Sequence, residues 1–258
     1  MKRFLTKSTA IRLLLQAGFL LAIVAVYVYG TVRYPLEPVL AQTQAFERHY
    51  YATGMFPFVT SYLLFTPKDY DASRKYPLVL ALHGASKRSQ GANAASSDDV
   101  QKICDCFVLM PMAPPYRAWA DAEGSVEALA MAMDMLEGVR QTYSIDETRI
   151  YVTGHSMGAV GTFAALAHYS EAFAAGVAVN GYWFPADAAK FRDQKLWVFH
   201  GNKDQIFPIA DTFALVRQIG MEGGNPKFTV MNGVGHNSWP TYRDPALWRW
   251  LTTQRREH

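Results

Sequence analysis

Short apolar runs alternate with longer helical patterns through most of the chain. One run, 59–65, alternates apolar and polar residues, which predicts an outer antiparallel strand with one face buried. Compact apolar runs bounded by Gly or Pro are expected for strands buried in the middle of a sheet. The chain has six such runs, at 77–82, 107–110, 149–153, 176–179, 196–200 and 228–231.

Helical periodicity fills the gaps between these runs. Along 124–143, Val126, Leu129, Met133 and Leu136 recur every three or four residues, which predicts an amphipathic helix. Further helices are expected around 159–168 and 246–254. This alternation predicts an α/β fold with a mainly parallel central sheet and helices on both faces. With 258 residues, half of them hydrophobic, the chain is long enough for one such domain, which we place at 45–258.

The first 44 residues have a different character. No charged residue lies between 13 and 32, and a helix of that length, at about 1.5 Å per residue, spans the roughly 30 Å hydrocarbon core of a bilayer. We therefore expect a basic tail (1–12), a transmembrane signal-anchor helix (13–32) and a linker (33–44). Four basic residues precede the apolar segment and one follows it.

This charge bias predicts a cytoplasmic N-terminus and places the domain at 45–258 in the periplasm or outside the cell. The alternative for the N-terminal segment is a signal peptide that is cleaved to release a secreted protein.

Charge and cysteine content narrow the classes of function. Five of the 25 basic residues lie before residue 34, which leaves 20 basic against 22 acidic residues in the remainder. A near-neutral domain lacks the basic face that nucleic-acid binding requires. The two cysteines, Cys104 and Cys106, are too closely spaced for an ordinary disulfide, and no metal-ligand pattern accompanies them. We expect two free, buried thiols at a helix-to-strand junction, no metal site and no cofactor. An exported location leaves open a strained, functional disulfide between the two cysteines.

The strongest chemical signal is the segment RIYVTGHSMG at 149–158, followed by a helix-forming run. A Gly-x-Ser-x-Gly motif between a strand and a helix is typical of a nucleophile elbow, in which small residues flank a serine on a sharp turn. This context makes Ser156 the predicted nucleophile. The alternative, a chance motif in a loop, does not account for the strand before it and the helix after it.

A serine hydroxyl needs a general base, and that base needs an acid to orient it. His236 follows the last apolar run in the loop GVGHNSW, whereas His168 lies within a predicted helix, His200 ends a strand and His258 is the last residue. Asp204 follows the strand at 196–200, where the catalytic groups of parallel sheets gather. We predict His236 as the base and Asp204 as the acid. Rival acids are Asp187, Asp193 and Asp211.

Two backbone N–H groups are expected to stabilise the tetrahedral oxyanion. One belongs to Met157, directly after the nucleophile, and the other to Ala85, in the loop that follows the run 77–82. His83 is expected to brace this loop rather than to transfer protons. Aromatic residues predicted in loops are candidate substrate-lining residues: Trp119, Tyr182, Trp183 and Trp239.

The segments YPLVLALHG, TGHSMGAVGT, LWVFHGNKDQIFP and GVGHNSWP together resemble the esterase and polyhydroxybutyrate-depolymerase-like branch of the α/β-hydrolases, which includes proteins labelled predicted peptidases. The resemblance covers about residues 58–253. It implies a carboxylic-ester hydrolase without cofactor, acting through Ser156, Asp204 and His236. The partner is then a small-molecule or polymeric ester.

Two other functions remain open: a peptidase with the same triad, or a non-catalytic binding domain of this fold. Only about fifteen residues, 181–195, precede the acid-bearing strand, where many lipases carry a cap. That length predicts a loop with one short turn and no large cap domain.

Overall fold

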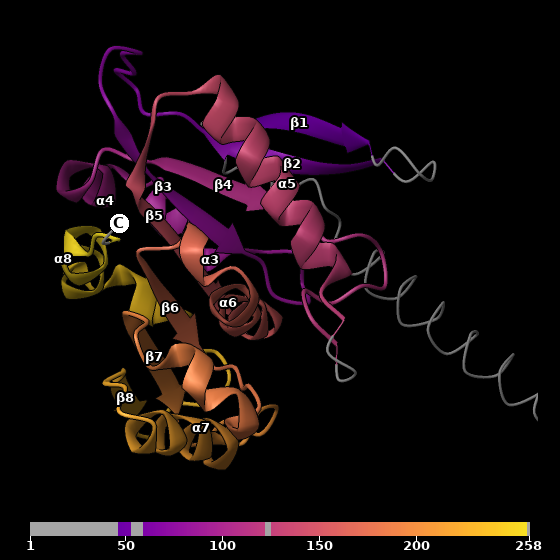
Figure 1. Cartoon of the computed structure of the whole chain (residues 1–258), viewed down its shortest axis with the longest axis vertical. Helices are drawn as coiled ribbons and strands as arrows, with labels where there is room; N and C mark the ends of the chain where they lie inside the picture. Colours follow the sequence, from indigo (N-terminus) through magenta and orange to yellow (C-terminus); the bar gives the residue numbers. More distant parts are fainter. Residues whose placement is uncertain (1–45, 53–58, 122–124, 257–258) are drawn as a thin grey trace, which may run out of the picture. The chain divides into compact units, whose positions relative to one another are not determined.

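The computed structural model describes residues 46–52, 59–121 and 125–256. Ala45–His258 forms one compact unit. Within the described residues, eight strands form a sheet in the order β1-β2-β4-β3-β5-β6-β7-β8 (Figure 1). The strands are β1 (Phe46–Ala52), β2 (Val59–Phe65), β3 (Tyr76–Leu82), β4 (Phe107–Pro111), β5 (Ile145–His155), β6 (Ala175–Val179), β7 (Leu196–Gly201) and β8 (Lys227–Met231).

The strand directions divide the sheet into two parts. β2 runs antiparallel to both β1 and β4, whereas all pairs from β4 to β8 are parallel. This confirms the predicted antiparallel strand at 59–65 and the mainly parallel sheet. The run 59–65 is not the outermost strand, however, because β1 pairs with it from Phe46 to Ala52. β1 carries Glu47, Arg48 and His49, so it lacks the apolar run that marks a strand in the sequence.

Each face of the sheet is covered by its own helical layer (Figure 1). Side chains alternate along β3, so that Leu78, Leu80 and Leu82 pack in one core cluster and Val79 and Ala81 in the other. The first cluster includes residues of α5 (Glu127–Thr142), α6 (Met157–His168) and α7 (Ile209–Met221). The second includes residues of α3 (Gln90–Ala95), α4 (Asp98–Ile103) and α8 (Pro245–Thr253). Helices on both faces are therefore confirmed.

Three short 3-10 helices complete the described structure: η1 (Ser170–Ala172), η2 (Pro185–Phe191) and η3 (Trp239–Arg243). Parallel strands place their carboxyl ends at one edge of the sheet, where active sites of open α/β sheets form. The loops that leave β3, β5, β7 and β8 at this edge carry the predicted catalytic groups. The fold thus brings Ser156 and His236, which are 80 positions apart in sequence, within hydrogen-bond distance.

Most predicted elements match the observed ones to within a few residues. The largest departure is the run 149–153, which belongs to a strand of eleven residues, Ile145–His155. Pairing between Tyr76 and Ile145 begins the strand early, and a register shift separates it from the pairing of Leu78 with Ile150. The polar sequence Asp-Glu-Thr-Arg between these pairs hides the early start from a pattern of apolar residues.

The two cysteines lie where the sequence predicts them. Cys104 caps the end of α4, Cys106 directly precedes β4, and both are free and buried. Gln101 donates hydrogen bonds from its side-chain amide to the carbonyl oxygen and the sulfur of Cys106. The thiols therefore pack as part of the core on the α4 side of the sheet.

The predicted basic tail, transmembrane helix and linker, 1–44, lie outside the described residues. Among the residues that are described, no helix combines the length and the apolar character needed to cross a membrane.

Candidate active site

Ser156 lies on a sharp turn between β5 and α6. Its backbone has φ 60° and ψ −125°, a region that non-glycine residues rarely adopt and that is associated with functional sites. The flanking glycines are required by space. A Cβ atom on Gly154 would lie 2.2 Å from the backbone of Gly158, and one on Gly158 would lie 2.2 Å from the carbonyl oxygen of Leu82. The geometry is that of the predicted nucleophile elbow.

Backbone hydrogen bonds hold the elbow at the carboxyl edge of the sheet. The N–H of Ser156 donates to the carbonyl of Val179 at the end of β6, at 3.0 Å. Its carbonyl accepts from the N–H of Ala159, at 2.8 Å, in the first turn of α6. The strained turn is therefore anchored to both a strand and a helix.

The structure brings Ser156, His236 and Asp204 into one hydrogen-bonded row. Nε2 of His236 lies 2.7 Å from Oγ of Ser156, and Nδ1 lies 2.8 Å from Oδ2 of Asp204. An ionised carboxylate only accepts, so Nδ1 carries the proton and Nε2 is free to accept the serine proton. This arrangement meets the geometric requirement for general-base activation of a serine.

The environment of Asp204 keeps its carboxyl group ionised. Burial by itself would raise the pKa of Asp204, but hydrogen bonds from His236 and from the backbone N–H groups of Phe207 and Ile206 outweigh it, and the pKa lies below its ordinary value. Those two N–H groups donate to Oδ1 at 3.0 and 2.9 Å. Oδ2 is left to face the imidazole, which fixes the tautomer of His236.

The three rival acids lie elsewhere. Asp187 accepts a hydrogen bond from the indole of Trp183 and pairs with Lys190. Asp193 pairs with Arg192, and Asp211 lies in α7.

The loop after β3 lies beside the nucleophile. A Cβ atom on Gly84 would be 3.4 Å from the carbonyl oxygen of His155 and 3.8 Å from Cβ of Ser156. Ala85 follows in an exposed turn, and the role of its N–H in an oxyanion hole stays a prediction. Met157 is the first residue of α6, and the first N–H groups of a helix have no partner within the helix. Its N–H is thus left available at the position expected for an oxyanion donor.

His83 holds this loop in place, as its sequence position predicts. Nδ1 lies 2.7 Å from the carbonyl oxygen of Gly84, and Nε2 accepts from the N–H of Ala113 at 3.0 Å. Nε2 is therefore unprotonated and Nδ1 is the donor. Burial lowers the pKa of His83 to about 4. The imidazole is a neutral brace between two loops.

Two of the four candidate substrate-lining residues are buried, and for these the prediction is wrong. Trp119 is 1% exposed and donates its indole N–H to the carbonyl of His83. Trp183 is 2% exposed and donates to Asp187. Both indoles satisfy their N–H groups inside the protein and fill the core, because a buried indole needs such a partner.

The other two candidates lie at the surface. Trp239 is 37% exposed and faces the guanidinium of Arg243. Tyr182 is partly buried, and its ring centroid lies 5.0 Å from that of Phe207. Phe207 in turn lies 5.6 Å from the imidazole of His236, edge-on. Tyr182 and Phe207 thus form an aromatic wall that reaches the base.

Sequence reasoning missed Phe207 and three polar residues that contact the triad or its loops. His155 donates from Nε2 to the carbonyl of His236 at 2.6 Å, and burial lowers the pKa of His155. His200 donates from Nε2 to the carbonyl of Phe207 at 2.8 Å. Asn180, after β6, donates to Asp204 at 2.8 Å. Their only sequence signal is a polar residue at the carboxyl end of a parallel strand.

No multi-helix cover lies between β6 and β7. The segment contains one seven-residue 3-10 helix, η2, as its length predicts. Ser156 is partly exposed, and the side chain of His236 is 21% exposed. Within the part of the chain that the structure describes, both side chains are therefore partly accessible to solvent.

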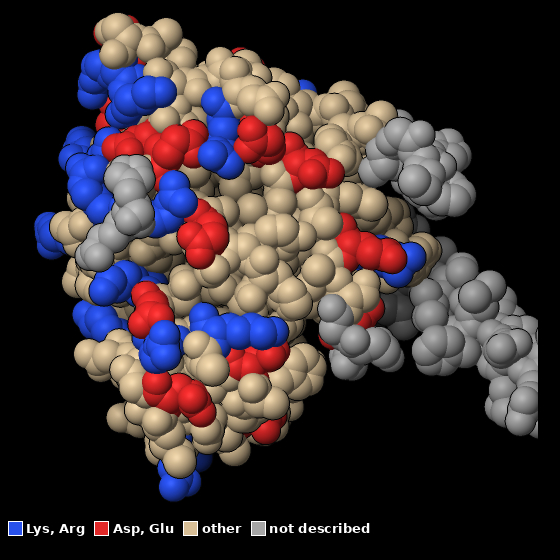
Figure 2. All heavy atoms as spheres, viewed as in Figure 1, with Lys and Arg blue, Asp and Glu red and all other residues tan. Residues whose placement is uncertain are grey.

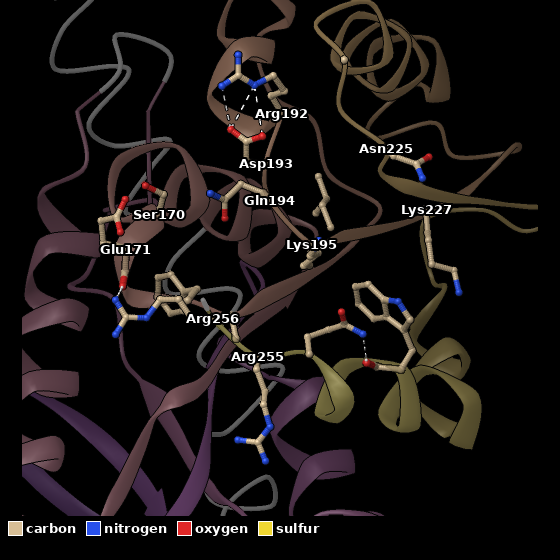
Figure 3. Close-up of a pocket in the computed structure, with 16 residues that line it drawn as sticks. Ser170, Glu171, Arg192, Asp193, Gln194, Lys195, Asn225, Lys227, Arg255 and Arg256 are labelled. Atoms are coloured by element: carbon tan, nitrogen blue, oxygen red, sulfur yellow. Dashed lines mark hydrogen bonds and ion pairs between the residues drawn. The ribbon is translucent and has the colours of Figure 1, made fainter. Parts of the chain in front are cut away.

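A cavity of about 810 Å³ lies at the opposite end of the parallel strands (Figure 3). Basic side chains surround it, in a region where charged residues crowd the edge of the molecule near α8 (Figure 2). Their charges are directed to neighbours, however: Arg192 pairs with Asp193, Arg256 donates to the carbonyl of Glu171, and Lys227 lies over the ring of Trp197. The cavity is remote from the serine and does not form part of the site.

Sequence comparison gives two matches that cover part of the chain. The profile of the Prolyl oligopeptidase family matches residues 124–183. Poly(3-hydroxyalkanoate) depolymerase C of Paucimonas lemoignei is 29% identical over 115 residues, which is 41% of this chain and 28% of that protein. The chain thus spans well under half the length of this relative.

Structural comparison gives matches over most of the chain. A thermostable esterase aligns with a TM-score of 0.79 and 30% identity over 84% of this chain and 64% of that one. A ferulic acid esterase of Anaeromyces mucronatus aligns with a TM-score of 0.63 over 81% of this chain and 90% of that one. At 13% identity, the latter shows the fold alone. The chain has the α/β-hydrolase fold and is similar to the thermostable esterase over most of its own length, although it spans less than two thirds of that protein.

Proposed function

We propose that this chain is a serine hydrolase that cleaves carboxylic esters, with Ser156 as nucleophile, His236 as general base and Asp204 as the orienting acid. The observation that carries the proposal is the continuous row of hydrogen bonds from the serine hydroxyl through the imidazole to the buried carboxylate. The position of Ser156 on a strained strand-to-helix turn, at the carboxyl edge of a parallel sheet, favours nucleophilic catalysis over a binding role.

In the proposed reaction, Oγ of Ser156 attacks the ester carbonyl while Nε2 of His236 takes the hydroxyl proton. The carbonyl oxygen becomes an oxyanion, which the N–H groups of Met157 and Ala85 would stabilise. Collapse breaks the bond to the alcohol, which receives the proton from His236 and leaves an acyl-enzyme. Water, activated by the same imidazole, then attacks the acyl group and releases the acid. Asp204 stabilises the imidazolium in both steps.

The serine is accessible, so the site suits an ester that can be cleaved without being enclosed by a cover. With no multi-helix cover between β6 and β7, the site has room for a bulky or chain-like acyl group. Similarity to a poly(3-hydroxyalkanoate) depolymerase is compatible with such a substrate. We expect ordinary saturation kinetics with soluble esters and no jump in rate above the solubility limit, since the segment between β6 and β7 forms no multi-helix lid that would have to open at an interface.

The experiment compares esters with amides on the purified full chain. Hydrolysis of p-nitrophenyl esters of increasing acyl length is measured beside the matching p-nitroanilides. We expect ester turnover that Ser156→Ala lowers by about 10³-fold or more. Ser170→Ala, a partly exposed serine of η1, is the matched control and should keep wild-type activity.

Three outcomes would contradict the proposal. Faster cleavage of the anilides would favour a peptidase. Absence of turnover in the wild type, with intact folding, would favour a binding domain. Ester turnover that survives in Ser156→Ala would remove the serine from the mechanism.

The proposal includes a membrane location. The charge-free stretch 13–32 and the basic residues before it support an N-terminal anchor with the catalytic unit outside the cytoplasm. A reporter that is active only after export, fused to the C-terminus, should be active, and the protein should stay in the membrane fraction after a carbonate wash. A silent export reporter would reverse the topology, and release by the wash would favour a cleaved signal peptide.

A further inference from the structure

We infer that Asn180 is a positioning residue for the triad, which ties the acid loop and the histidine loop to the end of β6. The inference rests on the function proposed above. Asn180 directly follows β6 and is fully buried. Its φ is 50°, a left-handed conformation that Asn adopts more readily than most residues. Its N–H donates to the carbonyl of Phe199 on β7 at 2.9 Å.

The side-chain amide makes four hydrogen bonds to three different segments. Nδ2 donates to Oδ2 of Asp204 at 2.8 Å and to the carbonyl of Gly235 at 3.0 Å. Oδ1 accepts from the N–H of Gly201 at 3.1 Å and from the hydroxyl of Ser238 at 2.9 Å. An amide offers two donors and two acceptor sites. Three of the four have partners whose roles are fixed, and the fourth faces the hydroxyl of Ser238, which can donate its one proton to Oδ1 or to the carbonyl of Gly235.

The orientation of this amide follows from its backbone partners. The N–H of Gly201 can only donate and the carbonyl of Gly235 can only accept. If the amide oxygen and nitrogen were exchanged, the oxygen would face the carbonyl oxygen of Gly235, and both are acceptors. The nitrogen would face the N–H of Gly201, and both are donors. Nδ2 must face Gly235, and the same nitrogen reaches Asp204.

These bonds connect the parts whose separation decides whether the triad works. Gly201 ends the acid-bearing strand, and Gly235 and Ser238 flank His236 on either side. Oδ2 of Asp204 accepts from both Asn180 and His236. Asn180 thereby fixes the distance from the carboxylate to the imidazole and takes up part of the carboxylate charge. Buried networks in which every group is satisfied are rigid and costly to disrupt.

Two substitutions separate these contributions. Asn180→Gly suits the positive φ and removes the amide. Asn180→Asp keeps the volume but places a carboxylate against Oδ2 of Asp204 and the carbonyl of Gly235, all of which are acceptors. In Asn180→Gly the carboxylate of Asp204 loses a donor, and in Asn180→Asp the two neighbouring carboxyl groups share one proton and carry a second negative charge once it is lost. In both variants a protonated imidazole is attracted more strongly and activity requires a higher pH.

The measurement is the rate at which a fluorophosphonate labels Ser156 in the full chain, as a function of pH. For Asn180→Gly we expect a loss of about 10- to 100-fold at neutral pH, as for other hydrogen bonds to charged groups, and a midpoint at higher pH. For Asn180→Asp the midpoint should rise by about one pH unit or more. If Asn180→Gly gives no soluble protein, Asn180→Asp, which keeps the volume, decides the question.

Thr153→Val is the matched control for lost stability. Thr153 is fully buried in the same sheet, and its hydroxyl bonds to the carbonyl of Val177 and to the hydroxyl of Tyr242. It should lower the melting temperature without moving the pH midpoint.

A purely structural role for Asn180 would lower the rate at every pH and leave the midpoint in place, and this result, or unchanged labelling, would overturn the inference. A wild-type chain that is not labelled would instead refute the proposed function itself.

Discussion

The buried imidazole of His83 makes the stability of the folded protein depend on pH. Its pKa is about 4 in the folded protein, chiefly because of burial, against an ordinary value of 6.5. Between these two pH values the unfolded chain binds a proton that the folded chain does not. The free energy of unfolding therefore falls as the pH falls from 6.5 towards 4. The stability that depends on neutral His83 is fully present only above pH 6.5.

The size of the effect follows from the gap between the two values. A gap of about 2.5 units, at about 1.4 kcal/mol per unit, gives roughly 3 kcal/mol of stability lost by pH 4. The structural reason is direct. Protonation would turn Nε2, which accepts from the N–H of Ala113, into a second donor facing a donor.

Urea unfolding between about pH 7 and pH 4, followed by tryptophan fluorescence, measures this slope. His83→Asn can still donate to the carbonyl of Gly84 but no longer titrates. It should be less stable than wild type at pH 7, by about 1–3 kcal/mol for the unpaired N–H of Ala113, and should lose roughly 3 kcal/mol less on acidification. His168→Asn, at an exposed position, is the control. The reasoning fails if His83→Asn has the same acid slope as the wild type.

Two further predictions concern packing. Gly158→Ala should lower the free energy of unfolding by about 3 kcal/mol or more in a denaturant titration, because the new Cβ would overlap the carbonyl of Leu82. The control Gly138→Ala, whose new Cβ has nothing within 4 Å, should instead add about 0.5–1 kcal/mol of helix stability. Equal effects would contradict the elbow geometry. Cys104 and Cys106 should not react with a thiol reagent until the protein is denatured, because both are buried. The hydrogen bond between the two thiols raises the pKa of Cys106 and lowers the pKa of Cys104, so for Cys104 the protection comes from burial alone. Rapid modification of the native protein would show that α4 opens.

The sequence predicts the residues whose type and order along the chain are required by the reaction. It does not predict the residues whose roles depend on contacts between distant loops. Ser156 and His236 stand out because a nucleophile elbow needs small residues on both sides of the serine and a base after the last strand. Asn180 and Phe207 have no comparable signal, because their roles depend on which loops lie side by side in space.

The sequence also fails to predict which tryptophan side chains are buried. Trp119 and Trp239 both fall in segments that the sequence predicts as loops, and the pattern of apolar residues gives no reason to separate them. Only the structure shows that the carbonyl of His83 provides a partner for the N–H of Trp119, which allows complete burial, while Trp239 stays at the surface. Burial of a loop aromatic depends on such a partner, which lies far away in sequence.

The central claim, that Ser156 performs the chemistry with His236 as its base, is tested most directly by active-site titration. The full chain is treated with increasing fluorophosphonate, residual ester hydrolysis is measured, and the modified peptide is identified by mass spectrometry. We expect one adduct per chain, on Ser156, activity that falls in proportion to labelling, and no adduct in His236→Ala over the same period. Full ester hydrolysis by a chain completely labelled on Ser156, or loss of activity through an adduct elsewhere, would contradict it.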